Sequence, residues 1–489
     1  MLSPNPSPPP VPENAASAPL PSSDAVRAAD RTTWRERLGF AAGTLPFNFG
    51  ASGLNTLAYP IYNITLGMSP TLIGLVLAIS RIWDGVADPV VGSYSDNFRS
   101  RWGRRRPFIA LGAVLCALTF PLIWLVPSGW GGTKAFGYFL ATTLLFYSAF
   151  AVYSIPYLTL GYEMSGDSNE RVRLHSVRAV VSKLTFFIIP WVFAIAQSPM
   201  FESTIAGMRA LGFIIGGLFI LLALPTVLLT RERFAKQAAT QRKVALLDGI
   251  KLTFRNRPFL YLVGIVLGML IANNLVSYLG IYVNTYHCFA GDTVAGAALH
   301  AKAQTLFAVA GMLSVPVVSR LATRYGKLRV IRWCIGCGVL AAISEFFFYS
   351  RAHPQLQYIS MLLLSPSFSG FWVLVDPMKA DTADYDECTT GLRREGTYAA
   401  VACWLEKMTL TGAMLFSGML LDFSGFDVAL GGAQHEGSLL AIRLMFSGAP
   451  ALLLAGSLVL AIRYPLPDEK VRLIRDQLRQ ARSAGGADR

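Results

Sequence analysis

Charged residues are scarce in this sequence. Asp, Glu, Lys and Arg together make up 15% of its 489 residues, whereas an average soluble domain contains about 25%. Apolar residues account for 53% of the chain. This balance argues against a soluble cytosolic enzyme and favours a chain that lies mostly in a membrane.

Motifs for catalysis and metal binding are also missing. The chain has 5 histidines, which form no cluster, and it contains no P-loop, no HExxH and no GxSxG. Its 6 cysteines show no framework of paired spacings. Cys334 and Cys337 have redox or zinc spacing, but they lie inside an apolar window without a second such pair, so we interpret them as packing residues. We therefore expect no enzyme activity, no ATP-driven transport and no cofactor.

Long apolar windows recur from one end of the chain to the other. A helix needs about 20 residues to cross the hydrocarbon core, and transmembrane strands would instead show short alternating runs. The windows are apolar on nearly every face, so the sequence predicts an all-α membrane protein with twelve transmembrane helices. Their expected spans are 39–63, 69–96, 107–127, 135–162, 176–197, 205–230, 258–286, 296–319, 328–350, 355–380, 396–422 and 437–463.

The two ends of the chain are polar. Residues 1–33 are rich in Pro, Ser and Ala and lack the apolar core of a signal peptide, so we expect a disordered cytoplasmic tail. Residues 465–489 form a basic tail, with Arg and Lys at helical spacing from Lys470 onwards. This tail fits a short helix on the inner membrane surface and a solvated tail equally well.

The basic residues behind the net charge of +14 lie mainly in alternate connections between the windows. Basic residues gather after the second, fourth, sixth and eighth windows, whereas the connections after the third, ninth and eleventh windows carry almost none. By the positive-inside rule, both termini are cytoplasmic, which requires an even number of spans. Because these charges are spread over several connections, we expect contact with membrane lipid and no binding of nucleic acid.

A polar, basic connection at 231–257 divides the chain into two six-helix halves, 34–230 and 258–464. A weak repeat supports this division, because Trp102-Gly103-Arg104 follows the second window and Tyr325-Gly326-Lys327 follows the eighth. Two pseudo-symmetric halves with a substrate cavity between them are one known transporter architecture.

Charges inside spanning windows are costly, so each one suggests a functional site. Arg81, Asp84 and Asp88 lie on the second window, and the two aspartates share one helix face because they are four residues apart. Two such carboxylates repel each other when both are ionised, so the pair is suited to bind a cation or to hold a proton. The alternative is that Arg81 simply neutralises Asp84 to hold helices together.

The eleventh window contains Glu406 and Lys407. A lysine in such apolar surroundings needs a carboxylate partner, for which Asp84 and Asp88 are the candidates across the bundle. A pair that breaks when a cation binds would couple ion occupancy to helix position. Snorkelling of Lys407 to the interface is the alternative.

Other polar residues inside the windows are candidates for contact with a solute. Arg178 lies in the fifth window, where a cytoplasmic anchor is its alternative role, and Asn274 lies in the seventh, where helix–helix hydrogen bonding explains it equally well. Asp376 precedes Pro377, which should disturb the tenth helix and expose carbonyl groups to a cavity. Trp372 offers a stacking surface, although a packing role fits it as well.

Two long motifs carry a family resemblance. RIWDGVADPVVGSYSDNFRSRWGRRRPFI (81–109) resembles the helix-2 signature of the glycoside–pentoside–hexuronide:cation symporters. FWVLVDPMKADTADYDECTTGLRREG (371–396) is similar to the signature that joins helices 10 and 11 in that family, and GRRRPF also resembles the sucrose transporters. The resemblance implies the major-facilitator fold and alternating access.

The resemblance also implies roles for individual residues. Asp84 and Asp88 match the two cation-site aspartates of the family, Lys407 matches the lysine that interacts with them, and Arg178 matches an arginine near the sugar site. Further residues match or adjoin the gating segments, and we assign them to a gate: Arg81, Asp96, Arg104, Arg105, Asp381, Asp384, Glu387, Arg393 and Glu395.

Departures from the family pattern bear on the ion and the solute. Ala87 and Ala151 stand where sodium-using members have neutral oxygen ligands, so the resemblance favours H⁺ coupling over Na⁺ bound at Asp84 and Asp88. Two acids that grip sugar hydroxyls in the family are absent. One aligns near Phe47, and Ser154 replaces the other, close to Tyr157; we count Ser154 and Tyr157 among the solute-binding candidates.

The sequence thus predicts a monomeric symporter of the cytoplasmic membrane that carries a small solute, a sugar or glycoside, with H⁺ or Na⁺. A second interpretation is a lysophospholipid transporter, because such carriers of the same superfamily share the helix-2 aspartates. A third is a transporter-like sensor, although its tails are short and of low complexity.

Overall fold

The computed structural model describes residues 31–127, 129–130, 132–165, 168–232, 256–390 and 395–484. These residues form helices joined by short connections, with no β-strand in the described ranges. A helical segment overlaps every apolar window of the sequence, so the all-α prediction is confirmed. Most of the expected N-terminal tail and central loop lies outside the described residues.

The first group of helices, here called the first half, occupies residues 34–229. Its opening segment alternates between α-helical and wider π-helical turns, and five long helices follow. The elements are α2 (Trp34–Ala42), α3 (Thr44–Asn48), η2 (Phe49–Gly53), α4 (Leu54–Ala58), η3 (Tyr59–Thr65), α5 (Pro70–Asn97), α6 (Arg106–Leu122), α7 (Gly132–Glu163), α8 (Ser168–Ala196) and α9 (Thr204–Leu229).

The second half occupies residues 257–462 and is followed by a C-terminal helix. Its elements are α11 (Arg257–Tyr282), η5 (Val283–Cys288), α12 (Thr293–Tyr325), α13 (Lys327–Phe348), η6 (Pro354–Leu356), α14 (Gln357–Thr390), α15 (Glu395–Phe423), η7 (Val428–Leu430), α16 (Glu436–Arg443), η8 (Leu444–Gly448) and α17 (Ala449–Ile462), and then α18 (Asp468–Ala484).

Short polar side chains fix where several helices begin. Asp292 accepts hydrogen bonds from the backbone N–H groups of Val294 and Ala295 at the start of α12, and Asn256 accepts one from Phe259 at the start of α11. At α2, Thr33 and Glu36 form a reciprocal capping box. These caps satisfy donors that the first turn of a helix leaves free.

Two helices extend well beyond their predicted spans. α12 reaches Tyr325 and α14 reaches Thr390, because hydropathy marks the part of a helix that lies in lipid and not the point where its hydrogen bonding stops. α14 runs through both Pro366 and Pro377, so neither proline ends the helix, and the expected local disturbance at Pro377 stays a prediction. Within the described residues, 9 helices are long and apolar enough to span a membrane, so the count of twelve spans stays a prediction.

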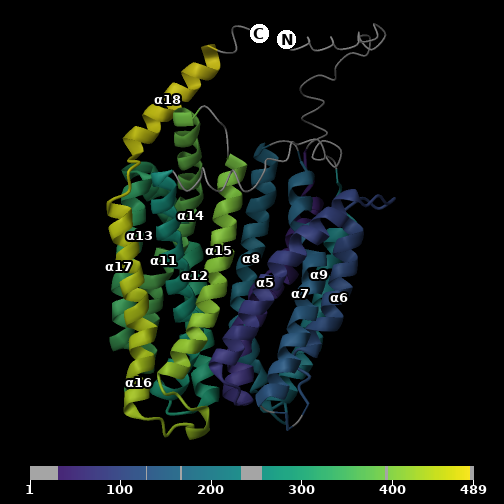
Figure 1. Ribbon diagram of the computed structural model, residues 1–489, viewed down its shortest axis with the longest axis vertical. Coiled ribbons are helices and arrows are strands. Elements are labelled where there is room, and N and C mark those ends of the chain that lie inside the picture. The colour runs from purple at the N-terminus through teal and green to yellow at the C-terminus, as the bar shows by residue number, and fades with distance from the viewer. Residues whose placement is uncertain are drawn as a thin grey trace, which may run out of the picture.

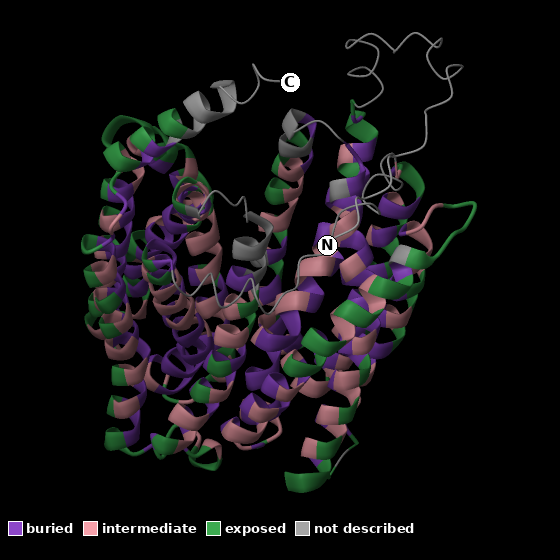
Figure 2. Cartoon of the chain, turned by 45° about the horizontal axis from the view of Figure 1, so that its top comes forward, coloured by how far each residue is buried: buried purple, intermediate pink, exposed green. Residues whose placement is uncertain are grey.

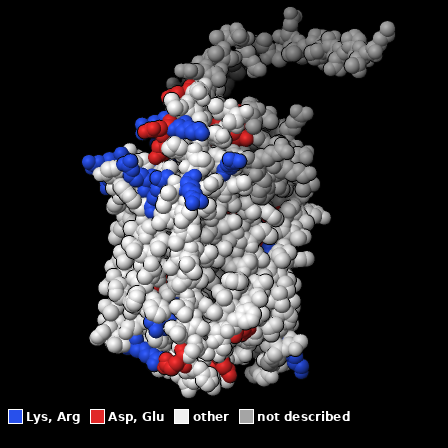
Figure 3. Space-filling view, turned by 60° about the vertical axis from the view of Figure 1, so that its left-hand side comes forward, with Lys and Arg blue, Asp and Glu red and all other residues white. Residues whose placement is uncertain are grey.

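The ends of the bundle differ in charge. The starts of α2, α6 and α13 lie at the same end as α18, at the top of Figure 1. In Figure 3 this end gathers Lys and Arg above a wide belt of uncharged atoms. We call it the basic end, and the other the opposite end. Buried residues face the inside of the bundle and exposed ones its outside (Figure 2).

The two halves meet mainly along α5 with α15 and α8 with α12. Near the opposite end, Tyr59 donates a hydrogen bond to the carbonyl oxygen of Met414 (2.8 Å), and Tyr282 donates one to Asn63 (2.9 Å). Asp422 of α15 accepts hydrogen bonds from the hydroxyl of Ser69 and from a backbone N–H in the first turn of α5. The halves are therefore joined at the opposite end.

Candidate functional site

Three charges lie on successive turns of α5. Arg81 Nη1 is 3.6 Å from Asp84 Oδ2, and the guanidinium lies over the ring of Tyr147, 5.1 Å from its centre. Arg81 also donates a hydrogen bond to the carbonyl oxygen of Ala51. Asp84 is only 5% exposed, and its Oδ1 has no hydrogen-bond partner among the described residues. A buried carboxylate oxygen without a partner favours binding of a proton or a cation.

Lys407 of α15 reaches across to the same helix. Its Nζ is 2.7 Å from Asp88 Oδ2, and the side chain of Asp88 is 14% exposed. The other oxygen of Asp88 is buried without a hydrogen-bond partner in the described part of the chain. The structure thus brings Asp84, Asp88 and Lys407 together at the contact between the halves, with one carboxylate oxygen of each aspartate left open.

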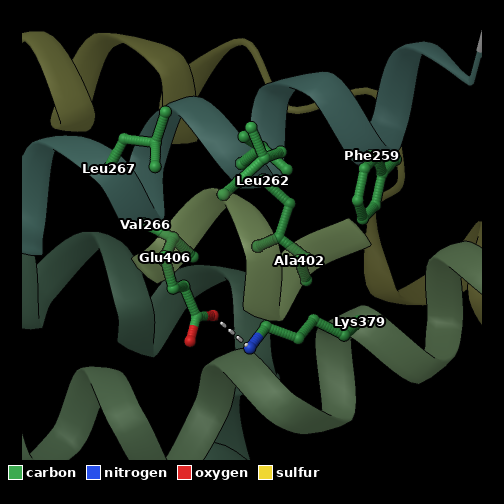
Figure 4. Close-up of a pocket in the computed structure, with 9 residues that line it drawn as sticks. Phe259, Leu262, Val266, Leu267, Lys379, Ala402 and Glu406 are labelled. Atoms are coloured by element: carbon green, nitrogen blue, oxygen red, sulfur yellow. Dashed lines mark hydrogen bonds and ion pairs between the residues drawn. The ribbon is translucent and has the colours of Figure 1, made fainter. Parts of the chain in front are cut away.

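A second charged group lies within the second half. Lys379 Nζ is 2.8 Å from Glu406 Oε1 and 3.3 Å from Asp376 Oδ1, and it lies 6.0 Å from the centre of the Trp372 ring. Figure 4 shows the Lys379–Glu406 pair at the edge of an apolar pocket formed by α11, α14 and α15. The side chain of Asp376 is 74% exposed.

Arg178 of α8 lies among aromatic rings of the first half. Its guanidinium is 5.4 Å from the ring centre of Phe47 and 5.6 Å from that of Tyr157. Tyr157 itself is buried, and its hydroxyl donates to the carbonyl oxygen of Phe40 and shares a 2.6 Å hydrogen bond with Thr44. Arg178 has no ion pair among the described residues, and only its hydrogen bond with the Tyr157 side chain is seen there, so further donors remain for a solute.

The other solute-binding candidates are less available. Ser154 is buried at 4% exposure. Asn274 is also buried, and its amide donates a hydrogen bond to the carbonyl oxygen of Leu270 one turn earlier. Trp372 is 39% exposed, so part of its side chain is accessible.

Five of the gating candidates lie at the basic end, whereas Arg81 lies beside Asp84 in the middle of α5. Glu163 of α7 binds Arg104 (2.6 Å) and Arg105 (3.0 Å), and Asp381 of α14 pairs with Lys327 of α13. These pairs tie elements of the same half together. Asp384 and Glu387 lie further along α14 and are partly buried. Arg393 and the side chains of Asp96 and Glu395 lie outside the described residues.

The sequence analysis does not identify Lys379 and Glu163, and it leaves Glu406 without a partner. Lys379 lies three residues after Asp376 in an apolar window, and this i, i+3 spacing is the signal that identifies it. Glu406 was noted, but its partner was not. Glu163 lies four residues after Thr159, at the end of an otherwise apolar segment. A carboxylate in such surroundings needs a cationic partner.

The comparison with known families decides the classification. A family model described as "MFS/sugar transport protein" matches residues 39–468.

The chain belongs to this family.

Several relatives within it align over nearly their whole length. An uncharacterised symporter of Synechocystis is 26% identical over 93% of this chain and 98% of its own. A putative glycoside/cation symporter of Escherichia coli is 24% identical over 93% and 96%. A sodium-dependent lysophosphatidylcholine symporter of Xenopus tropicalis is 21% identical over 91% of each chain.

The fold agrees with this assignment. A bacterial homologue of the lysosomal transporter Spinster, solved in an inward-facing conformation, superposes with a TM-score of 0.65 at 15% identity and covers 91% of this chain and 99% of its own. The major-facilitator fold and the resemblance to glycoside–pentoside–hexuronide symporters are thereby confirmed. The likeness of GRRRPF to the sucrose transporters stays a prediction.

Proposed function

We propose that this member of the MFS sugar transport family is a cation-coupled symporter of a sugar or glycoside. The observation that carries the proposal is the geometry of Asp84, Asp88 and Lys407. Two carboxylates each keep one open oxygen, and the lysine that holds Asp88 comes from the other half. A cation that occupies Asp88 competes with Lys407, so its binding loosens a link between the halves.

We propose H⁺ as the coupling ion. Alkali cations prefer several oxygen ligands, and Ala87 and Ala151 supply no side-chain oxygen beside the two aspartates. A carboxylate oxygen alone is sufficient to take up a proton. Na⁺ remains the competing candidate, and the experiment below separates the two ions.

The solute would meet residues from both halves. Arg178 offers guanidinium donors beside Phe47 and Tyr157, and Asp376 offers an exposed carboxylate beside Trp372. Carboxylate and guanidinium groups bind sugar hydroxyls through charge-assisted hydrogen bonds, and aromatic faces cover the apolar face of a sugar ring.

Orientation and state follow from charge and contact. The positive-inside rule assigns the basic end, and with it both termini, to the cytoplasm. The halves are joined near the opposite end, whereas the Asp376 and Lys407 side chains, which lie well inside α14 and α15, are 74% and 51% exposed. These features support an inward-facing state of an alternating-access cycle in a cytoplasmic-membrane monomer surrounded by lipid.

Reconstitution into liposomes tests the proposal. The purified protein is given an imposed proton or sodium gradient and a panel of labelled mono- and disaccharides. We expect the inward proton gradient to drive accumulation of at least one sugar. Accumulation with sodium alone would overturn the choice of ion, and failure of both gradients with every sugar would overturn the function.

A substitution at the coupling site sharpens this test. Asp88→Asn should abolish sugar accumulation against a gradient but leave sugar exchange measurable. The substitution removes the carboxylate that binds the proton and keeps a side chain of the same size. Asp427→Asn, in an exposed loop at the opposite end, is the matched control and should behave as wild type. Undiminished accumulation by Asp88→Asn would contradict the assignment.

A second candidate, lysophospholipid transport, has one observation in its favour. An apolar groove of about 530 Å³ lies between α11, α15 and α17, where it is lined by residues such as Leu275, Phe416 and Leu452. Phe416 and Leu452 are 53% and 76% exposed, and the groove could hold an acyl chain. The same liposomes, offered labelled lysophosphatidylcholine, test this candidate.

A further inference from the structure

A small, partly open cavity lies between the halves. Its lining comes from the first half through Thr56, Tyr59 and Phe193, and from the second through Ser277, Tyr278 and His300. The cavity measures about 20 Å³, which is room for about one water molecule. A solute larger than water therefore does not fit while the halves hold this arrangement.

The order of the chain puts this cavity towards the opposite end. Thr56 and Phe193 lie near the ends of segments that start at the basic end, and His300 lies near the start of α12, which runs the other way. Tyr59 both lines the cavity and donates to the carbonyl oxygen of Met414 in the second half. Separation of the halves at the opposite end would break this bond and open the cavity to that side.

The lining is mostly apolar and carries a few uncharged polar side chains, which are Thr56, Tyr59, Ser277, Tyr278 and His300. None of the described residues that line the cavity is Asp, Glu, Lys or Arg. His300 makes no hydrogen bond to any described residue. Gly280 lies beside it, where an added Cβ would be 3.1 Å from the imidazole Cε1. The His300 side chain is partly exposed, so its ring nitrogens can form hydrogen bonds with a solute that enters the cavity.

We propose that His300, Ser277 and Thr56 form an outer subsite, which receives the uncharged, hydroxyl-rich ring of the solute when the halves open at the opposite end. The imidazole donates to one sugar hydroxyl and accepts from another, and the Phe193 and Tyr278 rings flank the sugar. This inference rests on the proposed function, since it requires the two halves to alternate.

Transport kinetics test the subsite. His300→Ala should raise the external half-saturation concentration of whichever of labelled sucrose, maltose and lactose is accumulated, by about tenfold, because a hydrogen bond to the solute is lost. His300→Asn keeps a donor and an acceptor and should recover most of the loss. Lys302→Ala, an exposed position on the same helix, is the matched control. Unchanged half-saturation in His300→Ala would overturn the subsite and leave the proposed symport intact.

Thiol labelling tests the opening of the cavity without any transport. Ser277→Cys should react with a membrane-impermeant methanethiosulfonate added at the opposite end of the molecule, and the parent chain gives the background from native cysteines. Labelling only from the basic end, or none from either side, would overturn the inference even if no sugar were transported. Labelling from the opposite end together with no transport of any sugar would overturn the proposed function and leave the opening of the cavity supported.

Discussion

The two halves cap one helix each in the same way at the basic end. In each half, a carboxylate located just after the sixth long helical segment accepts backbone hydrogen bonds from the start of the capped helix. In the first half, Glu232 accepts backbone hydrogen bonds from Arg104, Arg105 and Arg106 at 2.7, 2.8 and 3.1 Å. In the second half, Asp468 accepts one from Leu328 at 3.3 Å. The chain turns into both helices through a glycine of positive φ, Gly103 (103°) and Gly326 (89°).

The ion pairs beside these caps follow the same plan. Glu163 binds two arginines, and the side chain of Arg105 is only 3% exposed. Its counterpart Asp381 pairs with Lys327, whose side chain is 23% exposed. The halves thus share this arrangement, and among the described residues the cation of the first half is the more deeply buried. We infer that the first half is the stiffer body against which the second moves.

The largest expected effect comes from the buried pairs. Glu163→Gln removes the buried carboxylate that Arg104 and Arg105 share and should cost about 3–5 kcal/mol. Asp381→Asn should cost about 1–2 kcal/mol, because the lysine can reach water. Thermal unfolding of the two purified variants in detergent measures the difference. Equal losses would break the comparison between the halves.

Transport sharpens the comparison at the charged group of the second half. Lys379→Met removes the cation shared by Asp376 and Glu406, so sugar accumulation should fall by about tenfold or more. Replacing Glu406 by Leu in the same chain should restore part of it, since the pocket beside Glu406 is apolar. Arg351→Met breaks an exposed pair with Glu436 and serves as control. A double variant no better than the single would argue that the pair itself is needed.

A smaller effect is expected at the helix caps. Glu232→Ala removes three backbone acceptor contacts and should cost about 2 kcal/mol, whereas Asp468→Ala removes one and should cost about 1 kcal/mol. Hydrogen exchange at the first turns of α6 and α13 reports each loss locally. Greater fraying of α13 than of α6 would reverse the inferred order of stiffness.

The smallest expected effect is the pH dependence of the stability that Glu170 provides near the start of the first half. Burial raises the pKa of Glu170, but hydrogen bonds from Thr32 and Arg37 outweigh it and lower the pKa from 4.5 to about 2. A lowered pKa adds stability above about pH 4.5, which is lost as the pH falls towards 2. The difference in melting temperature between wild type and Glu170→Gln should therefore be constant from about pH 5 to 8 and shrink below pH 4.5. A difference that grows in acid would show the opposite sign.

Much of the fold could be predicted because lipid imposes long apolar helices. The contact of Lys407 with an aspartate of α5 also followed from the sequence, since a lysine in such surroundings needs a carboxylate. The hydrogen bonds that join the halves at the opposite end could not be predicted. They form between neutral groups such as the Tyr59 hydroxyl and the Met414 carbonyl oxygen. Groups of this kind are common in helices, and the sequence does not show which of them come into contact.

Helix ends and shared partners were the other limits. α14 continues past its lipid-buried part, so hydropathy placed its end too early. Lys379 has two carboxylate partners, Asp376 on its own helix and Glu406 on α15. A single sequence shows the spacing of the first but not the approach of the second.

Glu406 and Lys407 are neighbours on α15, yet one binds within the second half and the other binds the first half. Successive residues point about 100° apart around a helix, so a spin of α15 about its own axis would stretch both bonds at once. A tilt, by contrast, would stretch only the bond to α5. The pair therefore acts as a torsional stop, and α15 is left to move as a lever that swings without turning.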